Sequence, residues 1–245
     1  MNTADSLLSV ETLNAEWRTR SALMAISFSS REKFHNRIAV TSSFGTESAV
    51  LLHLVAKINR HIPIFFIDTG KHFKETLEYR DTVAEFLRLD NIVILKPDPE
   101  ELNFSDPNGI LYQSNPDRCC DIRKVKPLDL AIEGIDAWIS GRKRYQNANR
   151  EDLPIFETGR GEKIKINPLA NWNERDIAGY IENNNLPEHP LVAKGFPSIG
   201  CEVCTSRVLP GEDARAGRWR GSEKTECGIH MNAEGQWVRT GNQAK

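Results

Sequence analysis

Five cysteines are the residues of this chain with the clearest capacity for chemistry, and their spacing divides them into two pairs and one remote residue. Cys119 and Cys120 are adjacent, and about eighty residues later Cys201 and Cys204 form a Cys-x-x-Cys pair. Four thiolates of this kind suit a structural zinc ion or an iron–sulfur cluster. Because neighbouring residues diverge by about 100° on an ideal helix, an adjacent pair needs a local distortion to converge. A four-iron cluster, which is wider than one ion, accepts such ligands more easily.

Cys227 lies apart from both pairs, in a polar stretch near the C-terminus. A thiolate is a competent nucleophile toward an electrophilic sulfur atom. The alternative is an inert surface cysteine, but an unpaired thiol in such a stretch is unusual without a use. Lys224 and His230 would favour the thiolate, whereas Glu226 beside it would oppose ionisation. We expect Cys227 to be the catalytic residue.

Two loops have the composition of anion-binding sites. The first, Ser42–Glu47, follows an apolar run and combines hydroxyl groups and a glycine with the start of a predicted helix, whose dipole attracts negative charge. It lacks a Walker lysine, and the alternative is that its Ser and Thr residues only cap the helix. The second, Gly141–Arg144, places three cations in succession, which suits phosphate or sulfate unless the loop is merely solvated surface.

Strand-like and helix-like patterns alternate along the chain. Short apolar runs predict strands at 38–40, 62–67, 92–95 and 137–139. Helical periodicity predicts helices at 47–58, 75–89, 120–133 and 174–183. The turn 159–162 predicts a hairpin between 155–156 and 164–166. The alternation predicts an α/β fold with a doubly wound, mostly parallel sheet, whose strand C-termini gather the ligand-binding loops at one edge.

Composition limits the remaining possibilities. With 32 Lys and Arg against 34 Asp and Glu in 245 residues, the chain has no global attraction to nucleic acid or to an anionic membrane. It has neither a run of eighteen apolar residues nor a secretory signal pattern, so we expect a cytoplasmic protein. Residues 1–209 are expected to form the main domain. Residues 210–245, which are polar and rich in Gly and Arg, are expected to form a mobile tail that carries Cys227.

Placed after the first strand, Ser42–Glu47 resembles the modified pyrophosphate loop of the sulfonucleotide reductases, relatives of the adenylating ATP pyrophosphatases. Ile67–Gly70 resembles their second signature, where nucleotide contacts are made. The Cys-Cys pair, the later Cys-x-x-Cys pair and the sequence Glu-Cys-Gly-Ile-His at 226–230 are together similar to the cluster-bearing adenylyl-sulfate reductase branch of this family. The resemblance extends over 38–230 and implies the fold of the adenine-nucleotide alpha-hydrolase, or PP-loop, type.

The resemblance also implies roles for individual residues. It implies one [4Fe-4S] cluster held by Cys119, Cys120, Cys201 and Cys204, and a catalytic Cys227. Lys124 matches a family lysine that links cluster and substrate electrostatically. The chain departs from the family pattern at one place: it has Lys224-Thr225 where a second basic residue commonly precedes Glu-Cys-Gly. This departure concerns how the tail docks. The implied substrate-binding residues are Ser42, Ser43, Gly45, Thr46, Asp68, Thr69, Gly70, Lys124, Arg142, Arg144, Arg215 and Arg218.

The implied reaction is attack of Cys227 on adenylyl sulfate, with release of AMP and formation of S-sulfocysteine. Thioredoxin or glutaredoxin then releases sulfite by thiol exchange, in sulfate assimilation and cysteine biosynthesis. Three alternatives stay open: the same chemistry on 3′-phosphoadenylyl sulfate or on both nucleotides, an adenylating ATP pyrophosphatase with structural zinc, and a non-enzymatic iron–sulfur sensor. A homo-oligomer is suggested by the resemblance alone.

Overall fold

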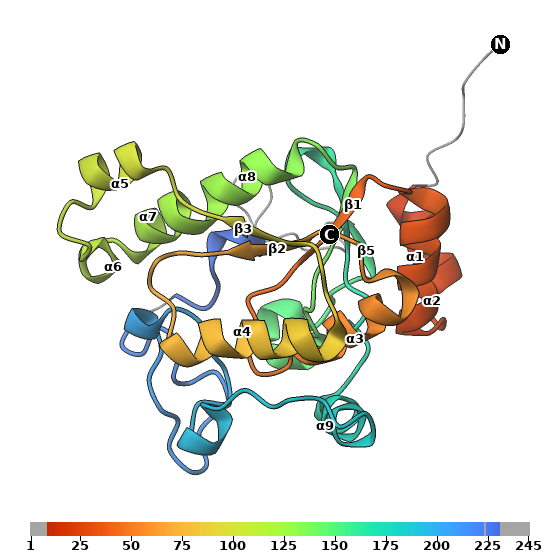
Figure 1. Cartoon of the computed structure of the whole chain (residues 1–245). Coiled ribbons are helices and arrows are strands. Elements are labelled where there is room, and N and C mark those ends of the chain that lie inside the picture. Colours follow the sequence, from red (N-terminus) through yellow and green to blue (C-terminus); the bar gives the residue numbers. More distant parts are fainter. Residues whose placement is uncertain (1–8, 223, 231–245) are drawn as a thin grey trace, which may run out of the picture.

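In the computed structural model, which describes residues 9–222 and 224–230, a six-stranded sheet forms the centre of the fold (Figure 1). Its order is β3-β2-β1-β4-β6-β5, and every neighbouring pair is parallel except β5 with β6. This topology confirms the expected doubly wound, mostly parallel sheet and the predicted hairpin. The strands are β1 (Ile38–Thr41), β2 (Ile64–Ile67), β3 (Ile92–Leu95), β4 (Ala137–Ile139), β5 (Phe156–Thr158) and β6 (Ile164–Ile166).

Alternate residues of the central strands face opposite sides of the sheet and bury two separate cores. Ile38 and Val40 of β1 join the larger core, whereas Ala39 between them joins the smaller one. Trp138 of β4 also belongs to the smaller core and is 1% exposed. Burial on both faces explains why these strands are continuous apolar runs. The helices that cover the two faces are α3 (Ser48–Asn59) and α4 (Lys74–Leu87) on one side and α8 (Lys126–Ile132) on the other (Figure 1).

Shorter helices connect and flank these elements. None of the helices in the described residues is long and apolar enough to span a membrane. The α-helices are α1 (Val10–Trp17), α2 (Ala22–Ser27), α5 (Pro99–Ser105), α6 (Leu111–Ser114), α7 (Pro116–Cys120) and α9 (Glu174–Asn183). The π-helices are η1 (Phe28–Lys33) and η2 (Asp121–Val125). The 3₁₀-helices are η3 (Arg144–Gln146), η4 (Ala148–Arg150), η5 (Arg160–Glu162), η6 (Val192–Lys194), η7 (Glu202–Cys204) and η8 (Gly228–His230).

The order of the strands reverses between β1 and β4. These two strands are neighbours in the sheet, although β2 and β3 lie between them in the sequence. Ligands of open α/β sheets bind outside the carboxyl ends of the strands at such a switch point. The loop after β1 begins at Ser42 and the loop after β4 begins at Ser140. Both predicted anion-binding loops therefore lie where the topology favours a ligand.

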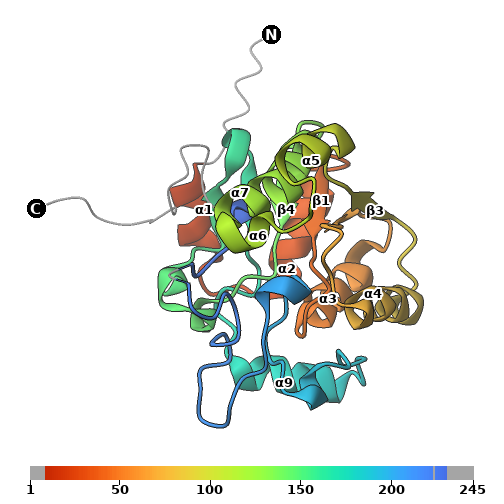
Figure 2. The same ribbon diagram turned by 90° about the vertical axis from the view of Figure 1, so that its left-hand side faces the viewer.

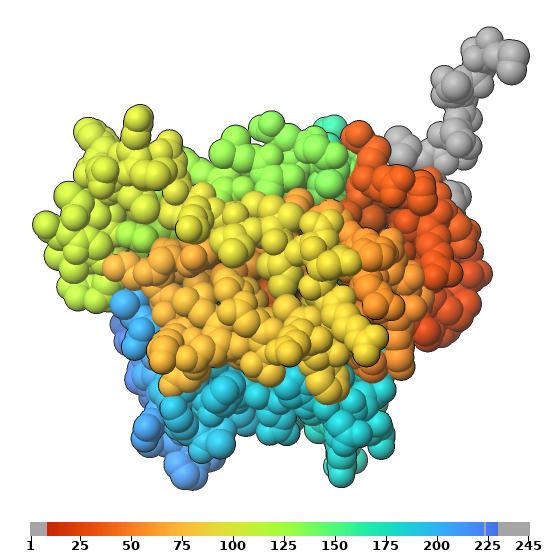
Figure 3. Space-filling view, viewed as in Figure 1, coloured from red at the N-terminus to blue at the C-terminus, as the bar shows by residue number. Residues whose placement is uncertain are grey.

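The C-terminal segment packs back onto the body as far as residue 230. Trp219 is 6% exposed, its N–H donates to the carbonyl of Cys204 at 3.0 Å, and Lys224 pairs with Asp117 of α7. Figure 2 shows this segment in blue, extending from the level of α9 to that of α7. Figure 3 shows the cyan part of the chain, to which Pro187 and His189 belong, packed against α4. A separate tail beginning at residue 210 and its mobility stay predictions, and residues 231–245 lie outside the described part.

The hairpin between β5 and β6 approaches Trp138 so closely that only glycine fits at its first turn position. A Cβ atom on Gly159 would lie 2.3 Å from Cη2 of Trp138. We expect Gly159→Ala to lower the free energy of unfolding by about 1–3 kcal/mol, the usual cost of overpacking, as measured by urea denaturation. Gly134→Ala is the matched control, because no atom lies within 4 Å of its Cβ position. Equal losses in both variants would contradict the steric explanation.

Candidate active site

One cavity at the carboxyl edge of the sheet brings together most of the residues selected from the sequence. Its volume is about 210 Å³, and three segments that are distant in the sequence contribute to its wall: the loop after β1, the loop after β4 and the C-terminal segment. The sequence-selected residues that line it are Ser42, Ser43, Gly45, Thr46, Lys124, Arg142, Cys201, Arg215, Arg218 and Cys227.

The hydroxyl residues of the first loop do not cap the helix that follows. The N-cap residue of α3 is Glu47, and its side chain makes no capping hydrogen bond. Instead, Ser42 Oγ accepts the N–H of Phe44 at 3.2 Å, and Thr46 Oγ1 donates to the carbonyl of Pro197 at 2.9 Å. Phe44, fully buried, holds the loop against the core. The capping alternative therefore does not explain this loop, and its place in the cavity wall does.

Glu47 connects the first loop to the basic loop. Its carboxylate accepts hydrogen bonds from Lys143 Nζ at 2.6 Å, from the Tyr145 hydroxyl at 2.5 Å and from Gln146 Nε2 at 2.9 Å. Burial raises the pKa of this carboxyl group, but the charge of Lys143 and the three hydrogen bonds outweigh burial and lower the pKa below its usual value. The ionised carboxylate thus holds the two anion-binding loops together.

We expect Glu47→Gln to lower the free energy of unfolding by about 1.5–3 kcal/mol at neutral pH, the range for hydrogen bonds to charged groups. A carboxyl group whose pKa is lower in the folded protein stabilises the fold above its unfolded pKa of about 4.3, and this stabilisation is lost as pH falls through the folded pKa. The difference between wild type and variant, measured by urea denaturation, should therefore shrink on acidification. A constant difference at all pH values would contradict this explanation.

The matched control for this prediction is Glu78→Gln. Glu78 pairs with Lys74 at 3.1 Å on the exposed surface of α4. Exposed ion pairs contribute at most about 1 kcal/mol, so this variant should differ little from the wild type at any pH.

Two buried arginines, Arg142 and Arg150, contribute positive charge to the cavity wall. They are 8% and 7% exposed and pair with Glu157 and Glu226, respectively. Burial lowers the pKa of Arg142 and the charge of Arg150 adds to this effect, whereas Glu226 and the Cys227 thiolate oppose it. Neither Nε–H group has a hydrogen-bond partner among the described residues. Buried guanidinium groups with unused donors suit an anionic ligand.

Arg144, the other arginine selected in the basic loop, does not line the cavity. It is exposed, and its Nε–H donates to the carbonyl of Leu153 at 2.8 Å. This placement differs from the expectation because the chain turns into η3 at Arg144. Arg150, which the sequence analysis did not select, lines the cavity through the next turn, η4. Its surroundings, Asn-Ala-Asn-Arg, carry no signal that could have identified it.

Arg215 and Arg218 line the cavity from the C-terminal segment. Arg218 Nη1 donates to the carbonyl of Ile199 at 3.1 Å, and its guanidinium lies 4.4 Å from the ring centre of Trp219. Arg215 Nη2 donates to the carbonyl of Thr225 at 3.0 Å. Both arginines are half-buried, and their approach to a bound substrate stays a prediction.

The loop Asp68–Gly70 lies beside a cysteine and not in the cavity wall. Thr69 Oγ1 is 3.3 Å from Cys201 Sγ, and Arg123 Nη1 donates to the carbonyl of Thr69 at 2.8 Å. The predicted substrate contact of this loop stays a prediction, and the contact that the structure places here is with one of the paired cysteines. His72, which the sequence analysis did not select, lines the cavity instead.

The two cysteine pairs lie within electrostatic range of one another. Cys119 and Cys120 end α7, and the π-helix η2 that follows is the kind of local distortion expected for an adjacent pair. Burial raises the pKa of both thiols, that of Cys120 to about 11. Burial also raises the pKa of Cys204, and the neighbouring thiolate of Cys201 adds to this. Among the described residues, no three His, Cys, Asp or Glu side chains are arranged to hold a metal ion.

Lys124 interacts electrostatically with the paired cysteines and with Cys227. Burial lowers the pKa of this half-buried amine, but the thiolates of Cys201, Cys227 and Cys120 outweigh burial and raise the pKa above its usual value. In the same way, burial raises the pKa of Cys201, but Lys124 and the Thr69 hydroxyl outweigh it and lower that pKa. Lys124 is thus a cation within electrostatic range of both the paired cysteines and Cys227.

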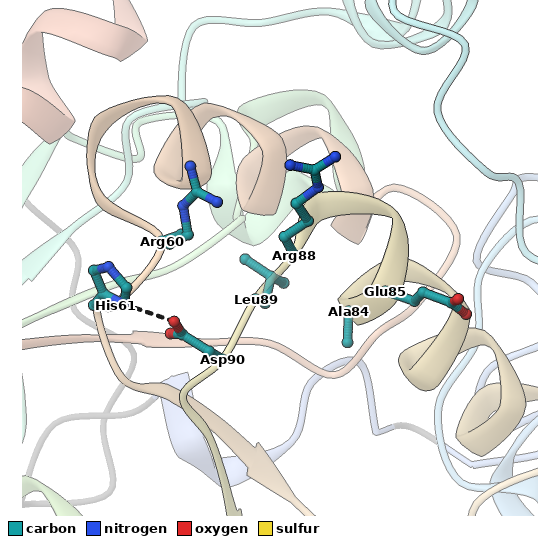
Figure 4. Close-up of a pocket in the computed structure, with 7 residues that line it drawn as sticks. All are labelled: Arg60, His61, Ala84, Glu85, Arg88, Leu89 and Asp90. Carbon is teal, nitrogen blue, oxygen red and sulfur yellow. Dashed lines mark ion pairs between the residues drawn. The ribbon is translucent and has the colours of Figure 1, made fainter.

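A second, open depression lies at the opposite edge of the sheet, where β2 and β3 begin (Figure 4). His61 Nδ1 and Asp90 Oδ2 are 2.7 Å apart there, and both side chains are well exposed. No residue selected from the sequence lines it, and ligands of such sheets bind at the other edge. It is lined by Arg60, His61, Ala84, Glu85, Arg88, Leu89 and Asp90.

The sequence is similar to known proteins over most of its length. Residues 37–207 match the family described as phosphoadenosine phosphosulfate reductase domain. The chain is 52% identical over 220 residues to the adenosine 5'-phosphosulfate reductase of Mesorhizobium japonicum, an alignment that covers 90% of this chain and 86% of that protein. It is 53% identical over 194 residues to the adenosine 5'-phosphosulfate reductase of Chelativorans sp., covering 79% of each.

Solved structures show the same architecture. The phosphoadenylyl-sulfate reductase of Candida auris has a TM-score of 0.70 at 28% identity, covering 83% of this chain and 98% of that one. Yeast FAD synthetase has a TM-score of 0.55 at 15% identity, covering 81% and 68%, which is a likeness of fold alone. The expected resemblance is confirmed: the chain belongs to the phosphoadenosine phosphosulfate reductase family.

Proposed function

We propose that the chain reduces adenylyl sulfate to sulfite and AMP. The observation that carries this proposal is the position of Cys227 in the same cavity as the Ser42–Thr46 loop and the buried arginines. A thiol among anion-binding groups suits a substrate whose electrophilic sulfur carries negatively charged neighbours. The two bacterial relatives, which are named for adenosine 5'-phosphosulfate, support this choice of nucleotide.

In the first step, the Cys227 thiolate attacks the sulfur atom of adenylyl sulfate. A bond forms between Sγ and that sulfur, while the bond from sulfur to the bridging oxygen breaks and its electron pair leaves with the AMP phosphate. The enzyme then carries S-sulfocysteine. Arg142, Arg215 and Arg218 line the cavity and are suited to stabilise the charge that develops on the leaving oxygen.

In the second step, a thiolate of reduced thioredoxin or glutaredoxin attacks Sγ of the S-sulfocysteine. Sulfite leaves with the bonding electron pair, and a mixed disulfide joins enzyme and reductant. The second thiol of the reductant resolves this disulfide, which restores Cys227 and leaves the reductant oxidised. Five free cysteines suit the reducing cytoplasm, where this step would serve sulfate assimilation and cysteine biosynthesis.

The C-terminal segment acts as a lid in this proposal. It supplies Arg215, Arg218 and Cys227 to one side of the cavity. The volume of about 210 Å³ is below the range of roughly 300–1,000 Å³ that is common for ligand pockets. The nucleotide therefore enters when the segment lifts, and docking of the segment brings the nucleophile to it.

We further propose that Cys119, Cys120, Cys201 and Cys204 hold one [4Fe-4S] cluster. The all-thiolate donor set, the burial of three of the four side chains and the π-helix after the adjacent pair support this ligand set. Lys124 supports it too, because a fixed cation offsets the negative charge of four thiolates. When bound, the cluster supplies fixed charge that tunes the site, without passing electrons to the substrate.

The test is sulfite release by the anaerobically purified full chain with adenylyl sulfate and reduced thioredoxin. We expect turnover with adenylyl sulfate and much slower turnover with 3′-phosphoadenylyl sulfate. The alternative is that 3′-phosphoadenylyl sulfate is the preferred substrate, which the 28% identity to the Candida auris phosphoadenylyl-sulfate reductase supports. In that case turnover should be faster with 3′-phosphoadenylyl sulfate than with adenylyl sulfate. No sulfite from either nucleotide, with iron content intact, would contradict both proposals and favour a binding protein.

A further inference from the structure

Glu226, which immediately precedes the nucleophile, is 3% exposed and faces the arginines of the cavity. From its sequence position alone it is expected to oppose ionisation of Cys227, but the structure directs its carboxylate to three other side chains. Oε1 accepts the side-chain N–H of Asn147 at 2.7 Å and pairs with Arg150, and Oε2 lies 3.4 Å from Arg215 Nη2. We propose that Glu226 is a positioning residue that docks the nucleophile segment by occupying an internal anion site.

This anion site joins the body of the protein to the C-terminal segment. Asn147 and Arg150 belong to the body, whereas Arg215 belongs to the segment and also donates to the carbonyl of Thr225 at 3.0 Å. Asn149 Nδ2 lies 3.1 Å from Thr225 Oγ1 and adds a second polar contact across the same boundary. The two residues before Cys227 are therefore tied to one short stretch of the body, which fixes where the next residue can lie.

Because Glu226 is buried, this contact stabilises only the docked position in which its carboxylate meets all of its partners. A buried carboxylate is tolerated only when it is paired and hydrogen-bonded, and three partners at this one site satisfy that condition. Arg150 is 7% exposed while the segment is docked, and lifting the segment removes its carboxylate partner and returns Glu226 to water. The segment is thus favoured in one docked position, which is the position that places Cys227 in the cavity wall.

The same geometry predicts that Glu226 accelerates the chemical step but weakens nucleotide binding. Its carboxylate neutralises part of the charge of Arg150 and Arg215, and both arginines line the cavity. Removing the negative charge should leave more positive potential for an anionic nucleotide. A loss of catalysis without a loss of binding therefore distinguishes a positioning residue from one that only stabilises the fold.

The test, which rests on the proposed function, compares Glu226→Gln with the wild type in the full chain. We expect S-sulfocysteine formation at saturating adenylyl sulfate without reductant, followed by mass spectrometry, to slow by about 100-fold, the scale of a misplaced reacting group. The dissociation constant for AMP should stay equal or fall. Alkylation of Cys227 by iodoacetamide without nucleotide should accelerate, because the segment is released. Asn147→Ala, which removes an uncharged partner, should slow adduct formation and accelerate alkylation to a smaller extent and leave the dissociation constant for AMP unchanged.

Glu212→Gln is the matched control, because Glu212 lies on the same segment but pairs with Arg220 at 2.7 Å, away from the cavity. It should behave as the wild type in all three assays. Wild-type rates of adduct formation or of alkylation in Glu226→Gln would overturn the proposal, as would a slower reaction with equally weakened AMP binding. If the wild type forms no adduct, the proposed function fails, and the alkylation and AMP measurements still decide the role of Glu226.

Discussion

Replacing Cys227 by serine is expected to abolish sulfite release, with a fall in kcat of at least about 10⁴-fold, the scale seen when a covalent nucleophile is removed. A serine hydroxyl is not ionised at neutral pH, and its oxygen cannot form the S-sulfocysteine that thiol exchange resolves. Mass spectrometry after incubation with adenylyl sulfate, without reductant, should detect the sulfo adduct on the wild type and none on the variant.

AMP binding separates lost chemistry from lost structure in this variant. Cys227 is half-buried in the cavity wall and serine is similar in size, so the dissociation constant for AMP should change by no more than about twofold, as for substitutions without a packing role. Abundant sulfo adduct on the Cys227→Ser protein would contradict the mechanism, because it would place the nucleophile at another residue.

Replacing Lys124 by glutamine is expected to lower the rate of S-sulfocysteine formation by about 100- to 1,000-fold, the usual loss when one charge-stabilising donor is removed from an active site. The Lys124 amine interacts with the thiolates of Cys201, Cys120 and Cys227, and it lines the same cavity as the arginines. Without it, the negative charges on the paired cysteines, the nucleophile and the substrate repel one another more strongly. Single-turnover measurements with adenylyl sulfate report this step directly.

Lys126→Gln is the matched control for Lys124. Lys126 lies two residues later, at the start of α8, but it is exposed and pairs with Glu101 at 2.5 Å outside the cavity. Its replacement should leave the rate within about twofold of the wild type, since an exposed ion pair contributes little. Unchanged turnover in Lys124→Gln would contradict the proposed electrostatic role, and equal losses in both variants would indicate a general effect on the helix.

The hydrophobic pattern of the sequence was sufficient to predict the sheet. The runs at 38–40 and 137–139 became β1 and β4 within a residue, because strands buried in a parallel sheet are apolar along their whole length. The run at 92–95 became β3, although its middle residues, Val93 and Ile94, are exposed. The helices of the Pro99–Ser114 region carried no such signal. α5 and α6 bury none of their residues, so no periodic apolar face marks them.

Residue type alone was enough to select many of the residues that line the cavity. Cysteines, serines beside glycine and clustered arginines each have a restricted chemistry, and most of those selected meet in one cavity. Arg144, Asp68, Thr69 and Gly70 were selected by the same reasoning but lie outside its wall, because a change of direction within one short turn decides which side of a loop faces a ligand.

The sequence by itself therefore determined the fold class and the family, and it selected Cys227 as the candidate nucleophile, because strand periodicity and motif spacing are local properties. Only the tertiary structure decided which charges surround that thiol. Arg150 and His72 come from unrelated segments and carry no local signal, and the motif that contains Glu226 does not indicate its partners, yet all three residues line one cavity wall. The pairing of Glu226 with Arg150 arises from burial and distance, which depend on how the chain packs and not on the residues beside each of them.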